Sequence, residues 1–183
     1  MKKICIDPGH GGEKHPGACY FGEKEKDLTL SISLGLKKHL TEAGFEVVMT
    51  RETDRDISLS DRCAISNKAK CDLFLSIHCN ASYNPKTKGI ETYRYGGKSK
   101  VSDVSLCVAK SIQKHLVNRT GAKDGGVRSN TTFTTLRKTA CPSLVLELGY
   151  LSNQYENLEL THPHYQELLI LGIVDGITKC GLS

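Results

Sequence analysis

The chain has 183 residues, of which 38% are hydrophobic, so we expect one domain over residues 1–183 with a single core. Its formal net charge of +5 comes from Lys and Arg residues spread along the whole sequence, which favours an anionic partner without identifying it. Nucleic-acid binding is not expected, because the basic residues form no concentrated stripe, aromatic residues make up only 6% and Trp is absent.

Targeting and redox features are few. No apolar run approaches the roughly 18 residues of a membrane span, and Asp7 comes too early for a secretory signal. Because the eight cysteines form no C-x-x-C pair, we expect reduced thiols that serve as small core residues in a protein made in the cytoplasm. This prediction covers Cys5, Cys63, Cys71, Cys79, Cys107, Cys141 and Cys180.

The first half of the sequence predicts alternating strands and helices. Residues 3–6 are typical of a short strand, and a Gly- and Pro-rich loop follows over residues 7–22. A helix is predicted from Asp27 to Gly44, since Leu28, Ile32, Leu36 and Leu40 recur at every fourth position. Residues 45–49 predict a strand, residues 58–68 a helix capped by a serine, and the apolar run 72–78 a strand buried on both faces.

The second half continues this alternation. We expect an edge-type strand at 89–95, a helix at 101–117, a polar surface loop at 120–135, a strand at 143–147 opened by Pro142, and a closing helix at 163–179. The predicted fold class is therefore α/β, with a central twisted sheet, mostly parallel or mixed, and helices on both faces.

Three ionisable residues follow predicted strands directly: His10, His78 and Glu147. In open α/β sheets ligands bind beyond the carboxyl ends of the strands, so these side chains can meet at one place. Glu147 follows the apolar run Leu144–Leu146, and a buried carboxylate needs a partner such as a metal or bound water. Taken singly, each histidine is more often a structural residue than a ligand. Their Gly-rich and polar surroundings favour the ligand hypothesis.

Four motifs carry a family resemblance. They are Ile6-Asp7-Pro8-Gly9-His10-Gly11-Gly12, Glu25-Lys26-Asp27-Leu28, Ser76-Ile77-His78-Cys79-Asn80 and Leu146-Glu147-Leu148-Gly149-Tyr150-Leu151-Ser152-Asn153. In order and spacing they resemble the zinc-dependent N-acetylmuramoyl-L-alanine amidases of the amidase 3 type, and the likeness spans essentially the whole chain.

The resemblance implies a role for each matching residue. His10, Glu25 and His78 match the ligands of one Zn²⁺ ion, and Glu147 matches the catalytic glutamate. Two imidazoles and one carboxylate leave a fourth position open on tetrahedral zinc, as in catalytic sites. The implied substrate is peptidoglycan, cut between N-acetylmuramic acid and L-alanine of the stem peptide, with Glu147 as general base.

Other residues compete for these roles. Glu23 lies two positions before Glu25, and only the family pattern and the following helix favour Glu25. His15, His162 and His164 are expected at the surface. Cys79 should face away from His78 because side chains alternate along a strand.

Substrate contacts are predicted less directly. Asn80 could orient the metal site or the substrate, or could stabilise a turn instead. Arg128, in the 121–135 loop with Lys123 and Asn130, could meet carboxylates of the stem peptide. Arg62 could equally form a structural ion pair, so it is not counted as catalytic.

Two other functions remain open: a zinc hydrolase acting on a different amide, and a non-catalytic wall-binding module that keeps the fold. The second predicts a lost catalytic glutamate, whereas Glu147 is present. For the setting, we expect a phage endolysin released at lysis or the catalytic domain of a longer secreted protein. The oligomeric state cannot be inferred.

Overall fold

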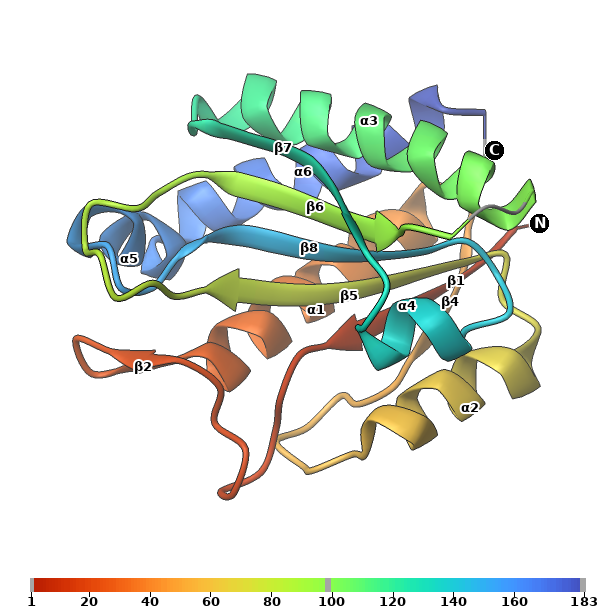
Figure 1. The fold of residues 1–183 in the computed structure, drawn as a ribbon, viewed down its shortest axis with the longest axis horizontal. Coiled ribbons are helices and arrows are strands. Elements are labelled where there is room, and N and C mark those ends of the chain that lie inside the picture. Colours follow the sequence, from red (N-terminus) through yellow and green to blue (C-terminus); the bar gives the residue numbers. More distant parts are fainter. Residues whose placement is uncertain (1, 98–99, 182–183) are drawn as a thin grey trace.

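Six strands form the central sheet in the order β4-β1-β5-β8-β6-β7 (Figure 1). The computed structural model describes residues 2–97 and 100–181. Neighbouring strands are parallel except for β6 and β8, which are antiparallel, so the predicted α/β fold with a mixed sheet is confirmed. The strands are β1 (Lys3–Pro8), β4 (Glu46–Met49), β5 (Leu73–Asn80), β6 (Ile90–Tyr95), β7 (Asp124–Asn130) and β8 (Ser143–Tyr150).

Helices pack on both faces of this sheet. A small hairpin of β2 (Cys19–Tyr20) and β3 (Glu23–Lys24) interrupts the long first loop and leads directly into α1. Among the described residues, none of the helices has the length and apolar composition needed to cross a bilayer. The helices are α1 (Glu25–Glu42), α2 (Leu59–Ala69), α3 (Lys100–Thr120), α4 (Thr134–Lys138), α5 (Gln154–Thr161) and α6 (Pro163–Lys179).

The two faces of the sheet differ in chemistry because side chains alternate along each strand. One face is apolar and packs against α1, α3 and α6; it contributes strand residues such as Ile6, Leu75 and Leu146 to the main core. The helix α2 lies on the other face (Figure 1), and its Ala69 packs against a second cluster around Cys5 and Phe74. Beyond that cluster, toward the carboxyl ends of β1, β5 and β8, this second face carries polar side chains.

The structure corrects several predicted elements. The strand predicted at the sheet edge, now β6, lies inside the sheet between β8 and β7. The predicted surface loop 120–135 contains the edge strand β7 and the start of the short helix α4, and α5 was not predicted. The last strand begins at Ser143, after Pro142, and continues past Glu147 to Tyr150, while β5 continues past His78 to Asn80.

The cysteine prediction is right for most positions. Cys5, Cys63, Cys71, Cys79 and Cys141 are free thiols and are buried. Cys107 is exposed, so it was wrongly predicted as a core residue, whereas Cys180 is half-buried and packs against the main core. Cys107 lies on α3, whose apolar face is formed by other side chains such as Val108 and Ile112.

Candidate metal centre and active site

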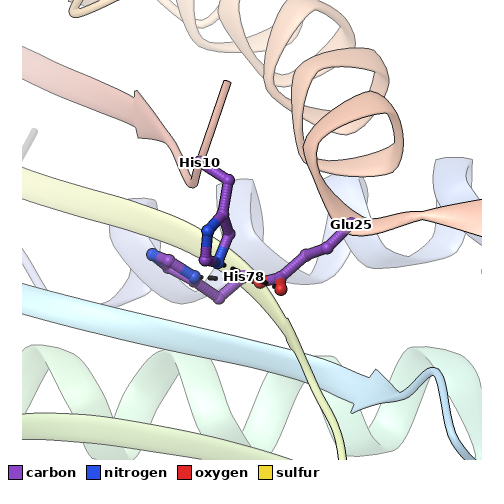
Figure 2. A group of neighbouring side chains, drawn as sticks. All are labelled: His10, Glu25 and His78. Atoms are coloured by element: carbon purple, nitrogen blue, oxygen red, sulfur yellow. Dashed lines mark hydrogen bonds and ion pairs between the residues drawn. The ribbon is translucent and has the colours of Figure 1, made fainter. Parts of the chain in front are cut away.

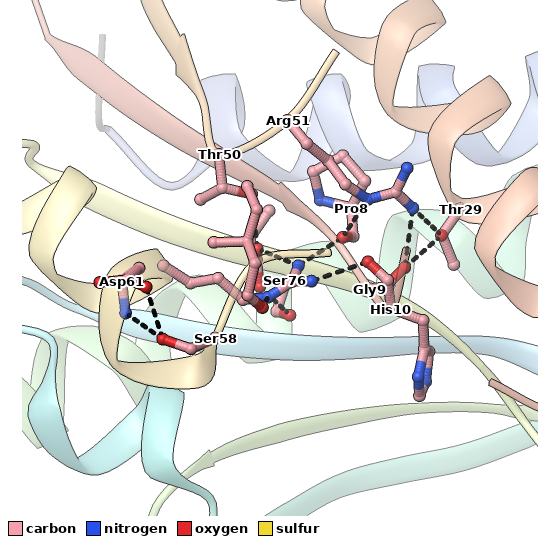
Figure 3. Close-up of polar contacts among 12 residues, drawn as sticks. Pro8, Gly9, His10, Thr29, Thr50, Arg51, Ser58, Asp61 and Ser76 are labelled. Atoms are coloured by element: carbon pink, nitrogen blue, oxygen red, sulfur yellow. Dashed lines mark hydrogen bonds and ion pairs between the residues drawn. The ribbon is translucent and has the colours of Figure 1, made fainter. Parts of the chain in front are cut away.

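His10 lies on the loop after β1 in a left-handed backbone conformation, with φ of 59°. A non-glycine residue adopts this conformation only when its surroundings hold it there. Arg62 Nη2 donates to the His10 carbonyl at 2.7 Å, and Arg51 Nη2 donates to the Gly9 carbonyl at 2.9 Å (Figure 3). Arg62 also forms an ion pair with Asp7 at 2.8 Å, so it has the structural role that the sequence left open.

Glu25 is the first residue of α1 and its side chain is buried. A carboxylate is favoured there by the positive end of the helix dipole. Backbone amides of Ala18 and Cys79 donate to its two oxygens at 2.9 and 3.0 Å. Glu23 lies on the hairpin strand β3 instead, and of these two glutamates only Glu25 belongs to the cluster described next.

His10, Glu25 and His78 meet at one point (Figure 2). His10 Nε2 lies 3.0 Å from Glu25 Oε2, and His78 Nδ1 lies 3.0 Å from Glu25 Oε1. One donor atom from each residue lies within 4.8 Å of the other two. Two imidazole nitrogens and one carboxylate oxygen are the donor set of catalytic zinc sites, so the residues present fit that ion.

The electrostatics of this cluster favour a cation. Burial would raise the pKa of the Glu25 carboxyl, but hydrogen bonds from His10 and His78 bring it below its ordinary value. Burial would lower the pKa of His78, but the hydrogen bond to Glu25 and the charge of Glu147 raise it instead. The site therefore stabilises positive charge at the position where a metal ion would lie.

Two glycines allow the ligands to pack this closely. A Cβ atom on Gly9 would lie 2.5 Å from Cε1 of His78, and one on Gly17 would lie 2.5 Å from Oε2 of Glu25. Gly17 also has a φ of +74°, a conformation that favours glycine. The glycine-rich first loop thus has a structural purpose, which is close contact with the ligand side chains.

Glu147 lies beside this cluster on β8, in register with His78 on β5. Its Oε2 atom is buried and has no hydrogen-bond partner among the described residues. Burial raises the pKa of Glu147 to about 7; His78 acts to lower it, and Glu25 and Glu91 to raise it. A carboxylate with an unpaired oxygen and a pKa near neutrality can accept and return a proton.

A cavity of about 480 Å³ opens on the side of His10 and His78. Its walls include Ile57 and Leu59 at the start of α2, and the exposed His15, which pairs with Asp56 at 2.9 Å. The cavity gives the metal cluster an open side, where a substrate has room to bind.

The other residues considered in the sequence do not belong to the metal cluster. Asn80 Oδ1 accepts a hydrogen bond from the amide of Ala81, as in the turn-stabilising alternative, and the β5–β8 register shifts between His78 and Asn80. Arg128 lies on β7 and pairs with Glu91 at 2.9 Å. His162 and His164 are exposed, and Cys79 is buried in the main core, as predicted.

Sequence reasoning missed Glu91. It is the register partner of Glu147 on the antiparallel strand β6, so both carboxylates lie on the same face of the sheet. Tyr93 donates a hydrogen bond to Glu91 Oε2 at 2.8 Å. Alternation along residues 89–95 was visible in the sequence, but the pairing of β6 with β8 was not.

Comparison with known proteins agrees with this geometry. Residues 4–179 match the family described as N-acetylmuramoyl-L-alanine amidase. The germination-specific N-acetylmuramoyl-L-alanine amidase of Bacillus subtilis (strain 168) is 30% identical over 97% of this chain and 79% of its own length. The endolysin of Bacillus phage SPP1 is 34% identical over 97% of this chain and 65% of its own length.

A solved structure extends the agreement to the fold. The catalytic domain of CwlV, an N-acetylmuramoyl-L-alanine amidase from Bacillus (Paenibacillus) polymyxa var. colistinus, superposes with a TM-score of 0.90 at 34% identity, covering 98% of this chain and 97% of that one. Family match, sequence identity and fold coincide over nearly the whole length. The chain therefore belongs to the N-acetylmuramoyl-L-alanine amidase family.

Proposed function

We propose that this protein hydrolyses peptidoglycan at the amide bond between N-acetylmuramic acid and L-alanine of the stem peptide, with one zinc ion held by His10, Glu25 and His78. Family membership supports the choice of bond. The convergence of these three side chains on one point supports the choice of metal. When bound, zinc would acidify a water molecule and polarise the scissile carbonyl.

Glu147 is the proposed general base and then general acid. Its position next to His78 lets it take the proton of the attacking water and deliver it to the nitrogen of L-alanine as the amide breaks. The single observation that carries this role is the buried Oε2 atom, for which the described part of the chain offers no hydrogen-bond partner. Left without a protein partner, that oxygen is available to water or substrate.

The rest of the site binds and positions the substrate. The cavity beside His10 and His78 has apolar walls at Ile57 and Leu59, which suit the apolar parts of a wall fragment. Arg128 is about half exposed beside the site, and its charge suits a carboxylate of the stem peptide. Asn80 remains a second candidate for a substrate contact.

Mass spectrometry of purified wall after digestion tests the function directly. The expected products are stem peptides with a free L-alanine amino terminus and glycan strands with free lactyl carboxyl groups. A chelator should stop their release, and added zinc should restore it. New ends within the peptides would support a different zinc hydrolase, and no new ends at all would support a non-catalytic wall-binding module.

A further inference from the structure

His78 has a second ring nitrogen, and its contacts form a chain into the protein. Nδ1 faces Glu25, while Nε2 points away from it (Figure 2) and lies 3.1 Å from Ser76 Oγ. Ser76 in turn donates its hydroxyl proton to Asp7 Oδ2 at 2.7 Å. Parallel pairing of Asp7 with Ser76, and the two-residue repeat from Ser76 to His78, place all three side chains on one face of the sheet.

Each hydrogen bond in this series has a fixed donor and a fixed acceptor. Asp7 forms an ion pair with Arg62, and its Oδ1 also accepts a hydrogen bond from Thr50 at 2.6 Å, so the Asp7 carboxylate acts only as an acceptor. Ser76 has one hydroxyl proton, which this acceptor takes. Its oxygen can therefore offer only a lone pair to His78, and Nε2 must donate a proton to it.

We infer that Asp7 and Ser76 are positioning residues that keep a proton on Nε2 of His78, so that Nδ1, which faces Glu25, is the nitrogen that gives its lone pair to the metal. This inference rests on the proposed zinc site and adds which nitrogen binds. Gly9 leaves room for this ring orientation, because a Cβ atom at position 9 would lie only 2.7 Å from Nδ1 of His78. A ligand whose other nitrogen is held in this way is oriented before the metal arrives.

The first test locates the proton in the unchanged protein. Nitrogen-15 NMR of the zinc-loaded enzyme should show the His78 proton on Nε2, exchanging slowly with water, and the metal on Nδ1. A proton on Nδ1, or metal bound to Nε2, would overturn the inference while leaving zinc-dependent cleavage intact.

The second test removes the Ser76 hydroxyl. Ser76→Ala should weaken zinc binding about 10- to 100-fold, measured by competition with a chromogenic chelator, and should speed exchange of the Nε2 proton. Ser33→Ala is the matched control, since Ser33 is also fully buried and its hydroxyl has no hydrogen-bond partner among the described residues. Equal zinc affinity in the two variants would count against a positioning role for Ser76.

Asp7→Asn tests the direction of the hydrogen bonds that link Asp7, Ser76 and His78. Two donors already meet Oδ1, so the substituted amide should place its NH₂ group toward Ser76. Ser76 would then donate to Nε2 and move the proton of His78 to Nδ1, against metal binding. Weaker zinc binding with the proton on Nδ1 supports the inference, and unchanged zinc affinity in the folded variant contradicts it.

Discussion

His78 and Glu147 are register partners on the parallel strands β5 and β8, so a proposed metal ligand and the proposed general base leave the same face of the sheet side by side. Neither residue ends its strand. Both strands continue, and backbone pairing on either side of the two residues fixes their separation. This arrangement places the base on a rigid element, where small displacements are resisted.

Replacing the base tests its role with the smallest change in shape. Glu147→Gln keeps the volume of the side chain but cannot accept the water proton. We expect kcat on purified wall to fall by about 10²- to 10⁴-fold, the usual contribution of general acid–base catalysis. Zinc content, measured by atomic emission, should stay near one ion per chain. Loss of zinc in this variant would instead make Glu147 a ligand, and ordinary turnover would eliminate the general-base role.

Glu147 should also make the metal-free protein sensitive to pH. Its pKa in the folded protein, about 7, lies above the ordinary value of a carboxyl group. The associated stability is therefore fully present below the unfolded-state pKa and is lost as the pH rises through about 7. A shift of this size corresponds to about 3 kcal/mol.

Urea unfolding with a chelator present measures this effect. Relative to the wild type, the free energy of unfolding of Glu147→Gln should rise by about that amount between pH 4.5 and pH 8. Comparing the two proteins at each pH removes the contributions of the groups that do not interact with Glu147. A constant difference across this range would show that the Glu147 carboxyl has an ordinary pKa.

Metal removal should lower thermal stability because zinc binds the folded state only. Free zinc at 100 times its dissociation constant adds about 2.7 kcal/mol, which for a chain of this length raises Tm by about 5–10 °C. Differential scanning calorimetry with zinc and with a chelator measures this difference. Glu25→Ala should abolish it, whereas Glu23→Ala, on the hairpin, should retain it. The same zinc shift in Glu25→Ala would place the ion elsewhere.

The sequence predicted the buried part of this fold well. The apolar runs before His78 and Glu147 predicted buried strands, which β5 and β8 confirm, and α6 has the predicted bounds. The edge strand β7 was missed because Gly125 and Gly126 remove apolar alternation from it. Its pairing with β6 depends on backbone hydrogen bonds, which any sequence can form.

The candidate site also contains residues that the sequence predicted and one that it did not. His10, His78 and Glu147 were predicted from strand ends, and Glu25 from the resemblance. Glu91 was not predictable, because β8 inserts between β5 and β6 although more than forty residues separate it from either in the chain. Only that strand order brings Glu91 opposite Glu147.

Arg128 should distinguish wall fragments by charge. Its ion pair with Glu91 keeps the guanidinium beside the site while leaving it about half exposed. Arg128→Gln should raise KM for fragments with free stem carboxylates by several-fold, since an exposed charged contact contributes about 1 kcal/mol or less. KM for fragments with amidated carboxyl groups should not change. An equal rise for both substrates would show that Arg128 only supports Glu91.

The glycine at position 17 provides the sharpest test of how the ligands are packed. In Gly17→Ala, the new methyl group would lie 2.5 Å from Glu25 Oε2 and 2.7 Å from His10 Cδ2. Because both are held by hydrogen bonds, the ligands must separate, and we expect zinc binding to weaken by at least tenfold in a chelator competition assay.

Gly22→Ala is the matched control for backbone strain. Gly22 also has a positive φ, of +88°, but a Cβ atom there would lie more than 4 Å from every atom of the described residues outside its chain neighbours. Each substitution should cost about 1–2 kcal/mol of folding stability through its left-handed backbone. Only Gly17→Ala should also lose zinc affinity. If both variants bind zinc like the wild type, close packing by Gly17 is not needed to hold the ligands, and the loop serves only to connect β1 to α1.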